Sequence, residues 1–332
     1  MSDRQHPWLM TPLAEFIRDE IARQGPVPFR RFMDLALYHP ELGYYRRTRD
    51  PFGKEGDFYT AEQVQPVFGT LIAAKIRELY EELGRPDEFT VAELGAGRGE
   101  MSPALSEWRY VPVDLAHGAL PAGFTGVVFS NEFFDALPVD VAVRRSGAFR
   151  MLRVGWDGSR FVWIEAEAAP PSIAGYIERY FPAREEGERV EINLDALAWI
   201  ERIAASLECG FVLTIDYGYT RRESVRFPQG TLMSYRHHTA IEEVLASPGE
   251  RDITAHVAFT ALEEHGARSG LAPVRFETLA RMLLDTGERG AFAAALEASD
   301  AAEEARRRLQ LKTLLFGMGE TFRVLLQRRV QK

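Results

Sequence analysis

Hydrophobic side chains near the start of the chain recur with the 3.6-residue period of amphipathic helices. This period predicts a first helix over residues 12–24, a second over 29–38 and a third over 64–82. Residues 40–60, between the second and third helices, are rich in Gly, Pro and aromatic residues. Such a composition favours irregular structure over another helix or strand.

Short apolar runs replace the helical period in the middle of the chain. Residues 89–94, 110–114 and 126–130 each form such a run, with the length of a buried strand. The clearest strand pattern, over residues 211–216, follows a helical pattern over residues 195–208. Because strands alternate with helices here, we expect an α/β fold with a mostly parallel sheet covered by helices on both faces.

Two further segments extend this plan. Residues 139–165 alternate between apolar and polar side chains and contain glycine turns, which predicts a small antiparallel excursion. Residues 321–330 form an apolar run that predicts a final strand. We therefore divide the chain into an N-terminal helical cap (1–85), a cofactor-binding core (86–220) and a substrate-side insertion that ends by completing the core (221–332).

The composition is that of an ordinary globular protein, with 332 residues, 46% apolar and 27% charged. The single cysteine, Cys209, cannot form an internal disulfide or a cysteine metal site. No apolar run approaches ~18 residues, so we expect no membrane-spanning helix. Residues 1–5 lack the pattern of a signal peptide, which favours a cytoplasmic protein. The formal charge of −9 disfavours a nucleic-acid groove and favours a basic peptide or protein partner.

The most informative segment is a glycine-rich loop after the first predicted strand. Residues 93–100 have the sequence Glu-Leu-Gly-Ala-Gly-Arg-Gly-Glu, with glycine at 95, 97 and 99. Glycines permit a tight turn and let a ligand approach the backbone closely. We expect a helix to follow the loop, with its first N–H groups directed at the ligand.

The spacing and charge of this loop favour S-adenosylmethionine over a nucleotide. A dinucleotide loop has its third glycine three residues after the second, whereas Gly99 follows Gly97 by two. A phosphate-binding loop would need Gly-Lys-Ser/Thr, which is missing. Glu93 disfavours phosphate and suits a ligand with an ammonium or sulfonium group. The alternative is a strand–helix turn that binds nothing.

Asp114 is the candidate ligand for the ribose of such a cofactor. It lies 21 residues after Glu93 and ends the predicted strand at 110–114. Dinucleotide folds place a ribose-binding carboxylate about 20 residues after the loop, at the end of the next strand. A surface turn aspartate is the alternative interpretation.

Residues 130–138, with the sequence Ser-Asn-Glu-Phe-Phe-Asp-Ala-Leu-Pro, resemble the signature of the MidA family. This family consists of S-adenosylmethionine-dependent methyltransferases related to the mitochondrial complex I assembly-factor arginine methyltransferase. The resemblance covers nearly the whole chain in the same order. The other similar segments are 12–45, 56–60, 68–69, 215–218, 231–237 and 252–257.

The resemblance implies a Rossmann-like class I methyltransferase core with an N-terminal helical cap and an inserted substrate-side region. It implies that the glycine loop holds the methionine end of the cofactor and that the end of the strand at 126–130 faces the transferred methyl. A segment of the cap would close over the cofactor. The cofactor-binding residues that it implies are Glu93, Gly95, Ala96, Gly97, Asn131, Asp57 and Thr60.

One stretch departs from the family pattern. Between the glycine loop and Asn131 the family usually has two strands and a helix, whereas this chain has only about thirty residues. The strand at 110–114 is therefore either the second or the third strand of the core. The role of Asp114 depends on which it is, and we expect a reduced or reshaped adenine pocket.

Three acids are candidates for the acceptor site. Methyl transfer from a sulfonium is an in-line displacement, in which orientation matters more than acid–base chemistry. If the acceptor is an arginine, carboxylates match its guanidinium in a bidentate way. Glu132 and Asp135 follow one core strand, and Asp216 ends another at the same edge of the sheet. Helix-capping and turn roles are the alternatives for these three residues.

His256 and the partners depend mainly on the resemblance. His256 lies among Thr, Ala and Val residues and is either structural or, as the family motif implies, catalytic. No metal is expected, because no convincing ligand set is present. The resemblance alone suggests a protein as the methyl acceptor, and a subunit of a respiratory complex is one candidate. Whether the protein itself forms a homodimer is left open. The competing function is a cofactor-binding assembly factor with little or no catalysis.

Overall fold

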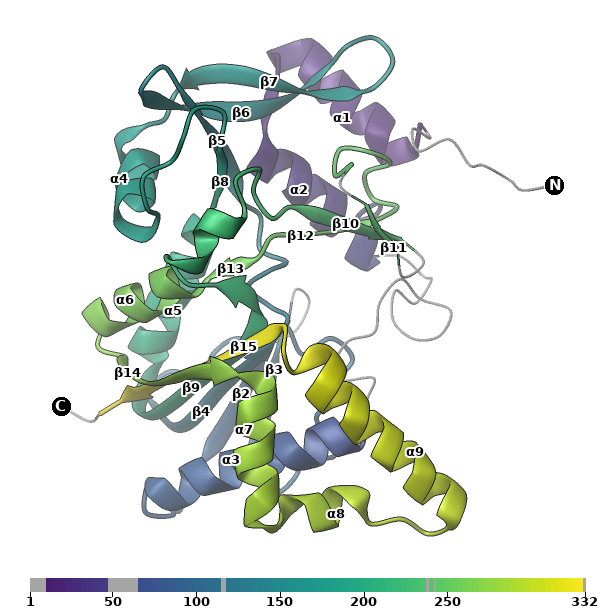
Figure 1. The fold of residues 1–332 in the computed structure, drawn as a ribbon, viewed down its shortest axis with the longest axis vertical. Coiled ribbons are helices and arrows are strands. Elements are labelled where there is room, and N and C mark those ends of the chain that lie inside the picture. The colour runs from purple at the N-terminus through teal and green to yellow at the C-terminus, as the bar shows by residue number, and fades with distance from the viewer. Residues whose placement is uncertain (1–9, 47–64, 115–117, 237–238, 242, 331–332) are drawn as a thin grey trace. The chain divides into compact units, whose positions relative to one another are not determined.

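The computed structural model describes residues 10–46, 65–114, 118–236, 239–241 and 243–330 (Figure 1). The chain forms two compact units, and each is assembled from three separate segments. Unit 1 consists of residues 1–59, 136–195 and 220–256, and unit 2 consists of residues 60–135, 196–219 and 257–332. None of the described helices is both long and apolar enough to cross a membrane.

Unit 2 is built on a seven-stranded sheet in the order β14-β15-β9-β4-β2-β3, with β13 paired to β9 (Figure 1). Strands β3, β2, β4 and β9 run parallel, whereas β15 is antiparallel to both of its neighbours. The strands are β2 (Thr90–Leu94), β3 (Arg109–Val113), β4 (Phe124–Asn131), β9 (Leu207–Tyr219), β13 (Val257–Ala258), β14 (Ala272–Thr278) and β15 (Phe322–Arg329). This sheet confirms the predicted α/β fold and every strand predicted for it.

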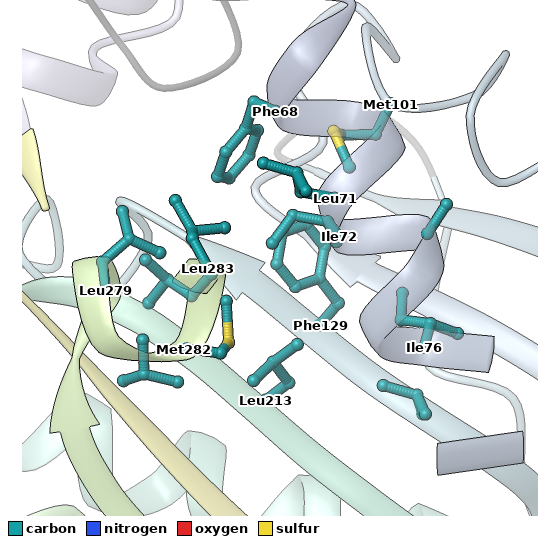
Figure 2. Packing of buried hydrophobic residues seen from close by; sticks show 14 of the residues in the cluster. Phe68, Leu71, Ile72, Ile76, Met101, Phe129, Leu213, Leu279, Met282 and Leu283 are labelled. Carbon is teal, nitrogen blue, oxygen red and sulfur yellow. The ribbon is translucent and has the colours of Figure 1, made fainter. Parts of the chain in front are cut away.

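Helices cover the sheet of unit 2 on two faces, which explains why its central strands are continuous apolar runs. The helices of unit 2 are α3 (Val67–Glu82), most of α5 (Leu194–Ser206), α6 (Phe259–Arg268), α7 (Leu279–Thr286), α8 (Phe292–Leu296) and α9 (Ala301–Lys312), and the last two contact other helices. On one face, α3 and α7 pack against β4 and β9 (Figure 2). The side chains labelled there are Phe68, Leu71, Ile72, Ile76, Met101, Phe129, Leu213, Leu279, Met282 and Leu283.

Helix α6 packs on the other face of this sheet. Phe322, Val324 and Leu326 of β15 belong to the core beneath α3 and α7. Gln327 points to the opposite side because strand side chains alternate, and its amide lies 3.5 Å from the carbonyl oxygen of Leu262 in α6. The helices therefore sandwich the sheet, as predicted.

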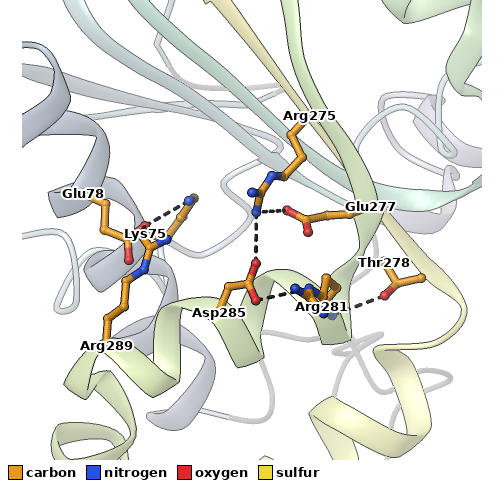
Figure 3. Close-up of polar contacts among 8 residues, drawn as sticks. All are labelled: Lys75, Glu78, Arg275, Glu277, Thr278, Arg281, Asp285 and Arg289. Carbon is orange, nitrogen blue, oxygen red and sulfur yellow. Dashed lines mark hydrogen bonds and ion pairs between the residues drawn. The ribbon is translucent and has the colours of Figure 1, made fainter.

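Charged side chains form ion pairs around α7 and α3 on the first face (Figure 3). Asp285 of α7 lies 3.0 Å from Arg275 of β14 and 3.2 Å from Arg281. Glu78 of α3 lies 3.1 Å from Arg289, which follows α7. The arginines are largely exposed, so each pair contributes roughly 0–1 kcal/mol. These contacts therefore contribute little to the stability of the fold.

Unit 1 is built on an antiparallel sheet in the order β1-β6-β5-β8, with β7 paired to β6. Its strands are β1 (Val27–Pro28), β5 (Asp140–Arg145), β6 (Ala148–Trp156), β7 (Phe161–Ala168) and β8 (Arg189–Ile192). A smaller sheet contains β10 (Met233–Arg236), β11 (Thr239–Ile241) and β12 (Asp252–Thr254). The consecutive strands β5, β6 and β7 confirm the antiparallel excursion predicted over residues 139–165.

The helices of unit 1 are α1 (Pro12–Gln24), α2 (Phe29–Tyr38) and α4 (Pro171–Tyr180). Thr11 caps α1, since its hydroxyl accepts a hydrogen bond from the N–H of Ala14. The apolar faces of α1 and α2 pack with β5 and β6 in one core. Both helices have the predicted bounds, whereas α3 begins three residues later than predicted and belongs to unit 2.

Candidate active site

The strand order in the sheet of unit 2 reverses direction at β2. Strand β3 follows β2 and pairs on one side of it, whereas the next strand, β4, pairs on the other side. The ends of β2 and β4 are adjacent, because Leu94 is the register partner of Ser130. Parallel sheets bind ligands outside the carboxyl ends of the strands at such a switch point. The glycine loop leaves β2 here, and residues 131–135 leave β4.

The glycine loop has a backbone that other residues rarely adopt. Gly95, Gly97 and Gly99 have φ angles of 69°, 52° and 75°. The N–H of Gly95 donates to the carbonyl of Val113 at 2.8 Å, which fixes the loop to β3. A Cβ on Gly95 would lie 3.1 Å from the ring of Phe133. A side chain at 95 would therefore fill the space that the loop shares with the end of β4.

The helix predicted after the loop is not formed, and this prediction was wrong. Residues 97–107 form successive turns. Two of these turns have a hydrogen bond between residues three apart in sequence. The N–H of Gly99 donates to the carbonyl of Ala96 at 2.7 Å, and the N–H of Ser102 donates to the carbonyl of Gly99 at 2.9 Å. The left-handed glycines prevent helical geometry at the start of this segment. A helix N-terminus therefore does not contribute to the site.

Asp114 lies against the glycine loop. Its Oδ2 accepts a hydrogen bond of 2.7 Å from the backbone N–H of Gly97. Strand β3 pairs directly with β2, so it is the second strand of the core in space as well as in sequence. The sequence left open whether the strand predicted at 110–114 is the second or the third core strand, and this pairing makes it the second. Asp114 therefore follows the second core strand, and its contact with a ribose stays a prediction.

Glu93 is a buried acid at the end of β2, with 1% of its surface exposed. Burial raises its pKa to about 7, and the negative charges of Glu100 and Asp114 act in the same direction. A hydrogen bond from the hydroxyl of Tyr110 opposes this rise. A nearby cation favours the ionised form of such a carboxylate. Glu93 is thus suited to an ammonium ligand.

Asn131 and Glu132 occupy the end of β4. Asn131 is 4% exposed, and its Nδ2 donates to Oε1 of Glu132 at 3.1 Å. Its Oδ1 is buried and has no hydrogen-bond partner among the described residues. Glu132 is half-buried and has a φ of 51°, a backbone state that costs roughly 1–3 kcal/mol and that clusters at functional sites. Its N–H donates to the carbonyl of Ile215 at 3.0 Å.

Asp216 is completely buried, and the backbone surrounds its carboxylate. Oδ2 accepts from the N–H groups of Phe134 at 2.9 Å and Asp135 at 3.4 Å, and Oδ1 accepts from the N–H of Tyr217 at 2.8 Å. Burial, and then the charge of Glu132, raise the pKa of Asp216 well above its usual value. The structure thus brings the three predicted acids together, with Asp216 and Asp135 buried and Glu132 the most exposed.

Aromatic side chains that were not predicted for the site lie beside the glycine loop and the end of β4. Phe133 is half-buried above Gly95 and meets Trp199 edge-on, with ring centroids 5.2 Å apart. The guanidinium of Arg202 lies 3.8 Å from the Trp199 ring. Tyr110, on β3, was missed as well. The sequence carries no signal for these contacts, because Gly95 comes to lie beside Phe133 only through the register of the folded sheet.

The remaining predicted site residues are His256, Asp57 and Thr60. His256 belongs to unit 1, where its N–H donates to Oγ1 of Thr231 at 3.0 Å and its ring meets Phe227 edge-on at 5.4 Å. Burial lowers the pKa of His256. Asp57 and Thr60 lie outside the described residues. Their roles, like those of the other predicted site residues, stay predictions.

Residues 103–277 match the model of a family described as "Putative S-adenosyl-L-methionine-dependent methyltransferase". This match covers more than half of the chain. The chain belongs to this methyltransferase family. Membership makes the protein a methyltransferase with S-adenosylmethionine as its cofactor, which confirms the enzyme class and cofactor that the sequence predicted.

Solved structures and curated relatives agree with the family. A methyl transferase candidate from Burkholderia thailandensis, bound to S-adenosyl-homocysteine, has a TM-score of 0.86 at 29% identity, over 96% of this chain and 92% of that chain. A second structure from that organism has a TM-score of 0.82 at 30% identity, over the same shares. The Drosophila melanogaster protein named arginine methyltransferase NDUFAF7 homolog is 26% identical over 74% of this chain and 68% of its own length. The Homo sapiens NDUFAF7 protein is 25% identical over 81% and 72%.

The residues at the switch point fit the family cofactor. Glu93 offers a buried acid for an ammonium group, and a Cβ on Gly97 would meet only Glu100, at 3.7 Å, so the backbone there is open to a ligand. We expect Glu93 and residues 95–97 to hold the methionine end and Asp114 to hold the ribose. When bound, S-adenosylmethionine supplies an activated methyl group on a sulfonium.

Proposed function

We propose that the protein transfers a methyl group from S-adenosylmethionine to an arginine side chain of another protein. The observation that carries this proposal is the chemistry at the end of β4. The Oδ1 atom of Asn131 is a buried acceptor with no partner among the described residues, and the carboxylate of Glu132 beside it can only accept when it is ionised. A guanidinium has five N–H donors and no acceptor, so it complements this pair.

The same pair can orient a guanidinium for displacement. Arginine stays protonated at neutral pH, so it is attracted by the carboxylate of Glu132. Two N–H groups bound on one side fix the plane of the guanidinium and leave a third nitrogen to face the methyl group. The methylated nitrogen then loses one proton, which the half-buried carboxylate of Glu132 can accept and pass to water.

The named relatives support an arginine acceptor. The Drosophila melanogaster and Homo sapiens proteins bear the name protein arginine methyltransferase, at 26% and 25% identity. The formal charge of −9 favours a basic segment as the substrate. The resemblance to the assembly-factor relatives suggests a respiratory complex subunit as the acceptor protein.

Mass spectrometry of labelled proteins tests the acceptor. Purified protein and S-adenosylmethionine with a deuterated methyl group are added to an extract of cells that lack the gene. We expect the label on arginine. Glu132→Gln keeps the shape but removes the charge, and we expect it to lower the transfer rate by about 10²-fold or more, with cofactor affinity nearly unchanged. Glu88→Gln, an exposed acid of unit 2, serves as the control.

Three outcomes would contradict the proposal. Label on lysine alone would give the site a different acceptor. Loss of cofactor binding in Glu132→Gln, with normal turnover at saturation, would move Glu132 into the cofactor pocket. Cofactor binding without labelling of any protein would favour an assembly factor without catalysis.

A further inference from the structure

The segment after β4 is held by a strand that is distant in sequence. Residues 132–135 leave β4, and the neighbouring β9 binds them at three points. The N–H of Glu132 donates to the carbonyl of Ile215 at 3.0 Å. The N–H groups of Phe134 and Asp135 donate to Oδ2 of Asp216. Consecutive residues of β9 thus receive three of the four N–H groups between 132 and 135.

Asp216 supplies acceptors for two backbone N–H groups beyond the end of β4. Phe134 and Asp135, which carry these groups, lie in the bend and turn that follow the strand. The carboxylate of Asp216 receives both N–H groups with one oxygen and that of Tyr217 with the other. Asp216 is 0% exposed, so each of these hydrogen bonds lies away from water, where its loss costs more than it would at the surface. An asparagine at 216 would have a single acceptor oxygen, so it could not accept both from Phe134 and Asp135 and from Tyr217.

The position of Glu132 depends on this arrangement. Its φ of 51° is unusual for a residue with a Cβ, and surrounding contacts have to maintain such a conformation. The bond to Ile215 holds Glu132 on one side, and the bonds of Asp216 to Phe134 and Asp135 hold the following residues. These bonds determine the direction in which the Glu132 side chain leaves the backbone.

We propose that Asp216 is a positioning residue that fixes the backbone of residues 132–135 and thereby aims the carboxylate of Glu132 at the methyl acceptor. The catalytic half of this inference rests on the proposed function. The structural half, the fixing of the backbone, does not. Asp216 does not contact the acceptor, in contrast to the catalytic contact that the sequence predicted for it.

Amide hydrogen exchange tests the structural half without any substrate. Asp216→Asn removes one acceptor, and we expect exchange in residues 132–135 to become at least about tenfold faster. Thr214→Val is the matched control, because Thr214 is 0% exposed on the same strand and its hydroxyl has no partner among the described residues. We expect exchange in the control to equal that of the wild type.

A double-mutant cycle tests the catalytic half. We expect Asp216→Asn to lower kcat for methyl transfer by about 10²-fold, the loss that a small misplacement causes, with KM for S-adenosylmethionine within about twofold of wild type. If Asp216 acts through Glu132, the same substitution in a Glu132→Gln background should cost less than about threefold. A merely structural role would give independent effects.

The two readouts separate the possible failures. Unchanged exchange, or equal effects of Asp216→Asn in both backgrounds, would overturn the inference. Faster exchange in a protein that labels no arginine would refute the proposed function and retain the structural role of Asp216. If thermal denaturation shows that Asp216→Asn does not fold, Asp216→Glu replaces it. This variant keeps both acceptors but displaces them, so intermediate exchange and kcat are expected, and wild-type values of both would contradict the inference.

Discussion

The hydroxyl of Tyr110 donates a hydrogen bond to the carboxylate of Glu93 across the ends of two adjacent parallel strands. This bond favours the ionised form of Glu93, whereas burial favours the protonated form and dominates, so that the pKa of Glu93 is raised to about 7. The acid beside the glycine loop therefore titrates near neutral pH. This property affects both stability and ligand binding.

Stability should fall as the pH rises through 7. The folded pKa of Glu93 exceeds its unfolded value of 4.5, so between these values the folded state holds a proton that the unfolded state has released. This contribution is fully present below about pH 4.5 and is lost above pH 7, with an upper bound of about 3 kcal/mol. Guanidinium unfolding at pH 5, 6, 7 and 8 measures it. We expect Glu93→Gln to reduce the loss, and an identical pH dependence in the variant would refute the assignment.

Gly97→Val should weaken cofactor binding at least about tenfold. A branched side chain would occupy the open backbone of the loop and would be strained at a φ of 52°. Gly84→Val is the matched control, because Gly84 has a φ of 82° and nothing within 4 Å of an added Cβ. Calorimetry with S-adenosylhomocysteine should show at least a tenfold loss for Gly97→Val alone. Equal affinities of both variants would mean that the loop does not bind the ligand.

Asp114→Asn should weaken cofactor binding by roughly tenfold or more. Hydrogen bonds to a charged acceptor contribute about 1.5–3 kcal/mol, and the amide retains one oxygen for the N–H of Gly97. Asp87→Asn, an exposed residue of unit 2, controls for the change of net charge. An effect below twofold in the same calorimetric titration would remove Asp114 from the ribose site.

Gly126→Ala should destabilise unit 2 by several kcal/mol. A Cβ on Gly126 would lie 1.9 Å from the carbonyl oxygen of Thr90, its register partner on β2, so the two strands would have to separate. Gly317→Ala is the control, since its Cβ would meet only a methyl group at 3.8 Å. Thermal denaturation should show a large loss for the first variant and little change for the second. Similar melting temperatures would contradict the close pairing of β2 with β4.

The fold was predictable where local patterns are strong. Helix α2 has the predicted bounds because an amphipathic period lies between Pro28 and Pro40. The central strands were predictable because burial on both faces produces continuous apolar runs. The helix expected after the glycine loop did not form, because the loop glycines adopt left-handed φ angles. The hydrophobic period of the sequence does not reveal these angles.

The candidate site was predictable only in part. Motif position indicated Glu93, Asn131 and Glu132, and the structure places them at one switch point. The contact of Tyr110 with Glu93 depends on strand register, which the sequence does not state. The role of Asp216 depends on backbone N–H groups about eighty residues away in sequence. The two units could not be predicted, because each combines three distant segments.

Strand β15 has an interior place in the sheet, between β9 and β14, although it follows every other described strand in sequence. During synthesis β9 and β14 are therefore complete before their shared neighbour exists. Until β15 emerges from the ribosome, both strands present an unpaired edge that another chain can join. Closure of the sheet thus depends on residues 322–329, and a ribosome that stalls before residue 322 would leave the two strands with exposed edges.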